Sequence, residues 1–179
     1  TNCYTDLLIE QLHALGHEPI ACLAFTLAID FEGDQWTFFK FPPEDIAALY
    51  GLEILELAIW KPLDKHIEEQ LERKTPVLAE LDSYFLPDTA GTAYKRAHVK
   101  TTVAVNEFDL ANERMGYFHN QGYFYLQGED FREILQLNGL PHDRVLPPYV
   151  EMLKKSHHYK TLDSAAQLSL SLSLLAKHL

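Results

Sequence analysis

The sequence of 179 residues has few cysteines, a shortage of positive charge and no long apolar run. Its two cysteines, Cys3 and Cys22, are too few for a disulfide framework, so we expect a reducing compartment, the cytoplasm. The net charge of −11 argues against nucleic acid as a partner, because phosphate binding needs clustered Lys and Arg. No apolar stretch is long enough to span a membrane, so no membrane association is expected.

What is present is the composition of a globular domain. The chain is 47% hydrophobic and 12% aromatic, which is ordinary for one α/β or α+β domain with a real core. The first residue is Thr1 and a helix begins almost at once, while an apolar helical stretch runs to Leu179. We therefore expect the natural amino terminus to lie upstream and the chain to be part of a larger protein.

Helical patterns come first along the chain, and a clear β pattern follows. We expect strands over residues 52–59, 75–82, 98–105 and 114–120, and a turn with an aromatic strand over residues 30–41. Helices are expected over residues 3–15, from Pro19 through Phe25, over residues 43–51 and over residues 62–73. From Glu129 onward the pattern is mostly helical, with an extended stretch at residues 145–150. Helices followed by an antiparallel sheet indicate the α+β class.

Cys3 lies at the start of the first expected helix, and this position suits a nucleophile. Thr1 or Asn2 can cap the helix, so free backbone N–H groups and the positive end of the helix dipole point at the thiol. With a nearby imidazolium, such surroundings lower a cysteine pKa from about 8.5 to roughly 4 to 7. The alternative is a small buried hydrophobe, which is our interpretation of Cys22.

The β pattern supplies candidate partners for this thiol. A simple antiparallel hairpin centred on Asp109 places His98 directly opposite Asn120, within reach for an imidazole held by an amide. A register slip would bring His119 there instead. Asp82, at the end of its strand, is either a turn residue or an acceptor at the site.

These residues suggest acyl transfer with a division of labour. Cys3 attacks, His98 pairs with it and shuttles the proton, and Asn120 orients the imidazole ring. The Cys3 backbone N–H and one further donor would stabilise the oxyanion. Taken singly, His98 is more typical of a strand-end surface residue, and Asn120 of a turn.

Aromatic residues and further histidines are less informative. The aromatic residues either wall an acyl pocket or form the core; they are Trp36, Phe38, Phe39, Tyr84, Tyr117, Phe118, Tyr123 and Tyr125. His142, His157 and His158 lack the ligand spacing of a recognised metal site, so we read them as loop residues. We expect neither a metal nor a cofactor.

Several stretches resemble a bacterial domain-of-unknown-function family. They lie at residues 2–7, 23–39, 82–91, 98–101 and 116–120, within residues 1–137. That family in turn resembles the butirosin-pathway acyltransferase, which moves an aminoacyl group from a carrier-protein thioester to an amine. Its members are associated with amino acid:carrier protein ligases, which points to secondary metabolism.

The resemblance implies a papain-like cysteine-peptidase-type fold over residues 1–137, followed by an incomplete, mostly helical extension over residues 138–179. It places Cys3, His98 and Asn120 at the nucleophile, base and orienting positions. The second oxyanion donor, commonly a glutamine upstream of the cysteine, would precede Thr1.

The expected function is a cysteine-dependent acyltransferase. It would take an aminoacyl or peptidyl group from the phosphopantetheine thioester of a carrier protein to a small-molecule or protein acceptor. One alternative is a cysteine peptidase, amidase or thioesterase with the same residues, and another is a non-catalytic domain that docks a carrier protein. The carrier would need a basic area, and the available clusters are Lys95, Arg96 and Lys100, or Lys154, Lys155 and Lys160. A homo-oligomer is an open alternative, since the apolar terminal helix needs a covering surface.

Overall fold

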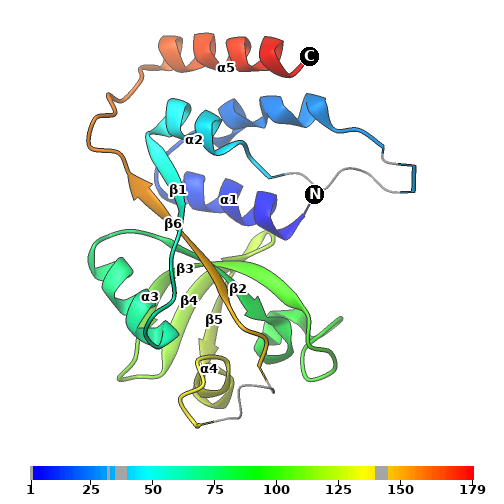
Figure 1. The fold of residues 1–179 in the computed structure, drawn as a ribbon, viewed down its shortest axis with the longest axis vertical. Helices are drawn as coiled ribbons and strands as arrows, with labels where there is room; N and C mark the ends of the chain where they lie inside the picture. Colours follow the sequence, from blue (N-terminus) through cyan, green and yellow to red (C-terminus); the bar gives the residue numbers. More distant parts are fainter. Residues whose placement is uncertain (1, 32, 35–39, 140–144) are drawn as a thin grey trace.

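The computed structural model describes residues 2–31, 33–34, 40–139 and 145–179. The fold is α+β, with one antiparallel sheet between two groups of helices (Figure 1). The strands are β1 (Leu52–Glu56), β2 (Val77–Asp82), β3 (Lys100–Asp109), β4 (Arg114–His119), β5 (Gly122–Gln127) and β6 (Tyr149–Lys155). Their order across the sheet is β1-β6-β2-β3-β4-β5, and each neighbouring pair is antiparallel.

Helices cover both faces of this sheet. The helices are α1 (Cys3–Ala14), α2 (Pro43–Tyr50), α3 (Leu63–Glu72), α4 (Gly128–Ile134) and α5 (Ser164–His178), with 3₁₀ segments η1 (Pro19–Ala28), η2 (Ser83–Phe85) and η3 (Pro87–Thr89). On one face, α1, η1 and α2 enclose a core with Leu78 and Ala104 of the sheet. On the other face, α3 and α4 pack on a second core that includes Val103 and Val105. Alternate residues of β3 therefore belong to opposite cores.

The ends of the first helices follow from local chemistry. The Asn2 side chain caps α1 by accepting a hydrogen bond from the Thr5 N–H at 2.9 Å. At the carboxyl end of α2, Gly51 adopts the left-handed conformation that ends many helices. Both boundaries confirm the sequence-based prediction to within one residue.

The sheet differs from the prediction at several strands. The expected strand over residues 52–59 ends at Glu56, and β5 is a strand that the sequence pattern does not predict. Only Tyr149 and Val150 of the extended stretch expected at residues 145–150 belong to β6, whose other residues lie where the sequence indicates mostly helix. β6 pairs with both β1 and β2. β6 lies beyond the boundary predicted at residues 137/138, yet it belongs to the same sheet. The strand expected within residues 30–41 falls largely outside the described residues.

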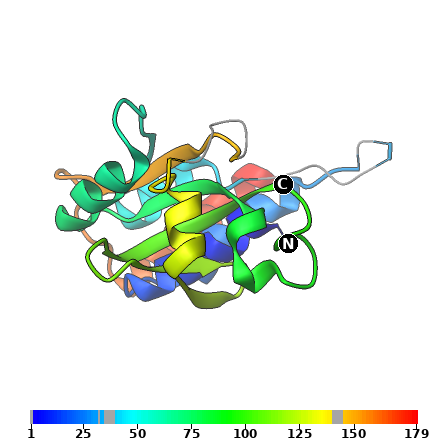
Figure 2. The same ribbon diagram turned by 90° about the horizontal axis from the view of Figure 1, so that it is seen from below.

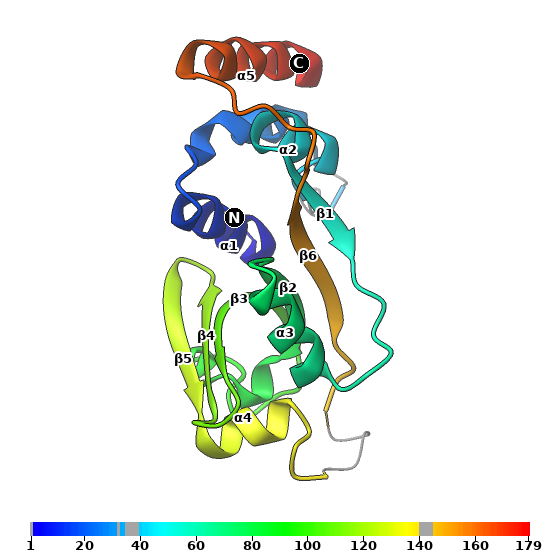
Figure 3. The same ribbon diagram turned by 90° about the vertical axis from the view of Figure 1, so that its left-hand side faces the viewer.

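The terminal helix α5 lies at one end of the molecule, separated from the sheet by η1 and α2 (Figure 3). Leu174 is its buried contact, and the Ser171 hydroxyl donates to the Ala21 carbonyl at 2.9 Å. Leu168 and Leu172 remain exposed, so neighbouring elements cover one side of this helix. No helix in the described parts of the chain has the length and apolar character needed to cross a membrane.

Two glycines with positive φ offer a matched test of how Tyr159 packs against Gly51. Gly51 has φ +66°, and an added Cβ would lie 2.1 Å from Cγ of Tyr159, whereas Gly16, at φ +80°, has nothing within 4 Å of that position. We expect Gly16→Ala to lower the free energy of unfolding by about 1 kcal/mol through backbone strain alone. Gly51→Ala should cost roughly 3 kcal/mol or more, because Tyr159 must also move. Urea unfolding midpoints measure both, and equal losses would contradict the packing described.

Candidate active site

A buried carboxylate at the end of β2 fixes the orientation of an imidazole. The Asp82 side chain is fully buried, and its Oδ2 lies 2.7 Å from Nδ1 of His98. The same carboxylate accepts backbone N–H groups from Tyr84 at 3.1 Å and from Leu146 at 3.2 Å. Asp82 pairs with Lys100, two residues after His98, which explains how the strand register brings the two side chains together. Since Nδ1 is held, Nε2 is the ring nitrogen left for proton exchange.

Aromatic rings fix the His98 plane. The imidazole stacks on the Tyr84 ring with centroids 4.3 Å apart and an interplanar angle of 10°. Phe85 meets it at 6.2 Å in an edge-on arrangement. The His98 side chain is nevertheless 44% exposed, so the ring is both oriented and accessible. An oriented, accessible histidine is suited to general acid–base chemistry.

Cys3 is the first residue of α1 and is half-buried. Its thiol has no hydrogen-bond partner among residues 2–31, 33–34, 40–139 and 145–179, so the structure does not show a Cys3–His98 hydrogen bond. The helix does cover the sheet face that carries Asp82 and His98, since it packs with Leu78 and Ala104. Figures 1 and 2 both place its amino end on the side where β2 ends and β3 begins.

The predicted pairing of His98 with Asn120 is wrong. The β3–β4 register pairs Ala104 with Phe118 and Asp109 with Arg114, with a bulge between Val105 and Glu107. The centre of the observed β3–β4 hairpin therefore lies further along the chain than Asp109, the predicted centre. The bulge also adds a residue to β3. Asn120 instead occupies the turn between β4 and β5 with φ +49°. The structure thus brings His98 to Asp82 and leaves Asn120 in a turn.

His119, the alternative partner, lies on the opposite face of the sheet. Its Nε2 is 2.8 Å from the Thr101 hydroxyl, and its Nδ1 contacts the buried Asp88 carboxylate. The Tyr117 hydroxyl donates to the same carboxylate. Thr101 pairs with Leu81, which belongs to the α3/α4 core, so this network faces away from α1. His119 therefore anchors the segment that carries Asp88 and is not placed to orient His98.

The remaining predicted residues divide between core, surface and undescribed positions. Tyr117 is fully buried and Tyr125 is exposed, whereas Tyr84 stacks on His98. Trp36, Phe38, Phe39 and His142 lie outside the described residues. His157 and His158 are exposed, and within the described ranges no three His, Cys, Asp or Glu side chains are grouped to hold a metal ion.

The sequence predicts Asp82 as either a turn residue or an acceptor at the site, and the structure shows both, since its side chain caps η2 and contacts His98. The positions of Asp82 and His98 in the sequence indicate part of this arrangement. An Asp that ends one strand and a His that precedes the next become neighbours when the two strands pair antiparallel. The sequence does not show that β2 and β3 pair directly, and this pairing is what brings Asp82 next to His98.

The fold and the site together define an α+β protein that places a helix-start thiol and an Asp-oriented histidine on the same side of an antiparallel sheet. The chain belongs to the DUF1839 family, because the DUF1839 N-terminal domain matches residues 1–155. This match runs through β6 and so includes the whole sheet. No curated protein matches the chain.

The two cysteines should differ in reactivity. Cys22 is 1% exposed, its Sγ donates to the Pro19 carbonyl at 3.1 Å, and burial raises its pKa to about 11. We expect iodoacetamide at pH 7 to label Cys3 alone in the folded protein and to reach Cys22 only in urea. Peptide mass spectrometry measures the site, with Cys3→Ser as the control. Equal labelling of both thiols in the folded protein would contradict this environment for Cys22.

Proposed function

We propose that this protein is a cysteine-dependent acyltransferase that takes an aminoacyl or peptidyl group from a carrier-protein thioester through an acyl-Cys3 intermediate. The observation that carries the proposal is the His98–Asp82 pair, an exposed imidazole oriented by a fully buried carboxylate. Accessibility distinguishes this pair from His119–Asp88 and His178–Asp45, because the His98 side chain is 44% exposed and those of His119 and His178 are 4% and 13% exposed. The resemblance to the butirosin-type acyltransferase, with its papain-like fold, supports the same chemistry.

The proposed reaction has two acyl-transfer steps. In the first, His98 accepts the Cys3 proton and the thiolate attacks the thioester carbonyl. The donor C–S bond breaks, and the departing phosphopantetheine thiolate takes the proton from the imidazolium. In the second, an acceptor amine attacks the acyl-Cys3 carbonyl and His98 accepts the amine proton. Cys3 leaves as the thiolate and takes this proton back from the imidazolium, which restores the starting state. Transfer of the acyl group from one sulfur to another changes the free energy very little, which suits a thioester donor.

Asp82 takes the orienting role in this scheme. Its carboxylate fixes Nδ1 and stabilises the imidazolium that forms when His98 is protonated. The backbone N–H of Cys3, at the positive end of α1, is a candidate oxyanion donor. Catalytic hydrogen bonds often tighten only with substrate bound, so an unpaired Cys3 thiol is compatible with this mechanism.

Docking of an acidic carrier protein would depend on the positive charges near the site. Lys95 is already paired with Asp130 at 2.7 Å and Glu133 at 2.9 Å, and Lys100 lies 3.8 Å from Glu80. Burial lowers the Lys95 pKa, but the hydrogen bonds to Asp130 and Glu133 outweigh it and raise the pKa overall. Among the basic residues near His98, Arg96 is therefore the better candidate for contact with a carrier.

An aminoacyl-loaded carrier protein tests the proposal directly. We expect an acyl adduct on Cys3 by intact mass, and none in Cys3→Ala. His98→Ala and Asp82→Asn should slow adduct formation by between about 10²- and 10⁴-fold, because each removes or misorients the base. Asn120→Ala should form the adduct at close to the parent rate, since Asn120 does not contact His98.

Two further outcomes distinguish the alternatives. If the adduct is lost to water at the same rate with and without an amine acceptor, the protein is a hydrolase that uses Cys3, His98 and Asp82. Absence of any adduct in the parent protein would overturn the catalytic proposal. Urea unfolding of Asp82→Asn is the required control, because this carboxylate is buried and links three segments.

A further inference from the structure

A second group of polar side chains lies immediately beside Cys3. The Tyr4 hydroxyl donates to Glu151 Oε2 at 2.8 Å, and the Tyr149 hydroxyl lies 3.2 Å from Glu151 Oε1. The ammonium group of Lys40 sits 4.3 Å from the centroid of the Tyr4 ring, 5.9 Å from that of Tyr149 and 3.6 Å from Glu151. Two aromatic faces and a carboxylate thus surround a primary ammonium ion.

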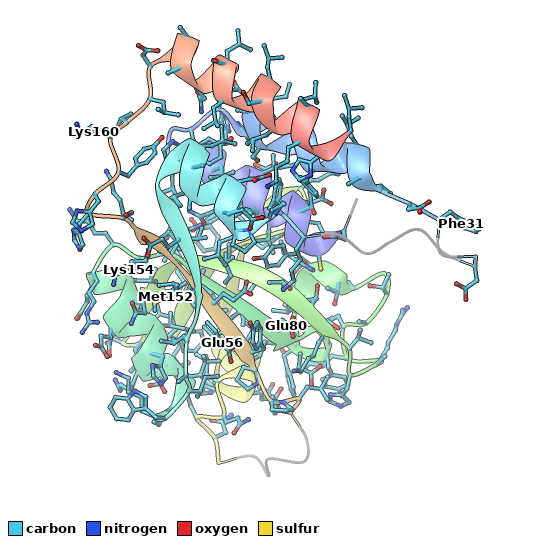
Figure 4. The ribbon with its side chains drawn as sticks, turned by 45° about the horizontal axis from the view of Figure 1, so that its top comes forward. Phe31, Glu56, Glu80, Met152, Lys154 and Lys160 are labelled. Atoms are coloured by element: carbon cyan, nitrogen blue, oxygen red, sulfur yellow. The ribbon has the colours of Figure 1, made fainter. Side chains whose placement is uncertain are left out.

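The surrounding sheet adds negative charge to this group. Glu151 lies directly opposite Glu56 on β1, and Tyr149 lies opposite Glu80 on β2. Figure 4 shows Glu56 and Glu80 on the two sides of β6. Like charges directly opposite on paired strands are destabilising unless a cation offsets them. Lys40 supplies that positive charge to Glu151 here.

The tyrosines remain neutral donors in this setting. Burial, followed by the charges of Glu151, Glu56 and Glu80, raises the Tyr149 pKa to about 12. Burial and Glu151 raise the pKa of Tyr4 as well. At neutral pH both hydroxyls therefore keep their protons and fix the Glu151 carboxylate, which holds the negative charge in one place.

The group is continuous with the candidate active site. Tyr4 follows Cys3 directly on α1, so the two Cα atoms are about 3.8 Å apart. Glu80, the residue opposite Tyr149, lies two residues before Asp82 and so shares its face of β2. The group around the Lys40 ammonium and the His98–Asp82 pair therefore occupy one face of the sheet at the amino end of α1.

We propose that Tyr4, Tyr149 and Glu151 form a subsite for the primary ammonium group of the aminoacyl donor, with the Lys40 ammonium occupying it in the free protein. The inference rests on the proposed function and adds a substrate class, acyl groups that carry a positive amine. A carboxylate and two aromatic faces are the groups that recognise an ammonium ion. A donor that binds here displaces Lys40, whose side chain is 41% exposed.

The chemistry assigns this subsite to the donor rather than to the acceptor. The amine of an aminoacyl thioester takes no part in the acyl transfer, so it can remain charged throughout. The acceptor amine must lose its proton to attack, and a site that stabilises its ammonium form would slow the second step. A negative subsite beside the nucleophile is consistent with a cationic donor.

Binding to a catalytically inactive protein tests the subsite separately from the reaction. In a Cys3→Ala background, glycinamide is titrated against uncharged acetamide and followed by NMR shifts of the Tyr4 and Tyr149 rings. We expect glycinamide to bind at least tenfold tighter than acetamide, Glu151→Gln to remove most of this difference, and Lys40→Gln to strengthen glycinamide binding several-fold. Equal binding of the two compounds, or an unchanged affinity in both variants, would overturn the subsite.

The chain offers a matched control for these substitutions. Glu107 accepts from the Tyr123 hydroxyl at 2.9 Å, and the Arg114 guanidinium lies 4.0 Å from the centroid of the Tyr125 ring. This is a similar Glu, Tyr and cation group, but it is on the exposed β3–β5 surface. Glu107→Gln should leave glycinamide binding unchanged. Glu151→Gln keeps the side-chain volume and an acceptor for Tyr4, and it relieves repulsion from Glu56, so we expect it to fold.

The acylation step provides the second readout. Glycyl and acetyl thioesters of N-acetylcysteamine are compared by the rate of adduct formation on Cys3 without an acceptor. The parent should prefer the glycyl donor, and Glu151→Gln should lower that preference about tenfold with the acetyl rate unchanged. If neither donor forms an adduct, the proposed function fails, and the glycinamide titration alone decides the subsite. A preference unchanged in Glu151→Gln would overturn the donor assignment.

Discussion

The Asp82 carboxylate is the interaction on which the candidate site depends. It is fully buried, and it accepts from the nearby Tyr84 and from two segments that are distant in sequence, His98 before β3 and Leu146 before β6. A buried carboxylate is stable only when donors surround it. The need to satisfy Asp82 therefore joins the end of one strand to the beginnings of two others, and the orientation of His98 follows from the same requirement.

Much of the local structure could be predicted from the sequence, because local chemistry decides it. The cap at Asn2, the prolines that open helices and the left-handed Gly51 mark boundaries within a few residues. The alternating pattern of β3 likewise identified a strand. These features depend on interactions within one turn or one strand, which a single sequence records.

The pairing of the strands could not be predicted in the same way. A hairpin register depends on the turn and on any bulge, and the irregularity at Asn106 shifts the β3–β4 pairing without a clear sequence signal. The Asp82–His98 contact further requires that β2 and β3 be neighbours, which no local pattern states. Residue type and position are enough to propose Cys3 and His98 as site residues, but the contact between Asp82 and His98 follows only from the three-dimensional pairing.

The position of β6 has a consequence for how the chain folds. β1 and β2 do not pair with each other, and each is hydrogen-bonded to residues 149–155, which come later in the sequence. Until those residues arrive, β1 has no partner strand and β2 exposes an open edge. Among the described strands, β6 is thus the last in the sequence and the one that joins β1 to the rest of the sheet. Such long-range pairing favours slow, late completion of the fold and makes the Leu146 contact to Asp82 one of the final bonds to form.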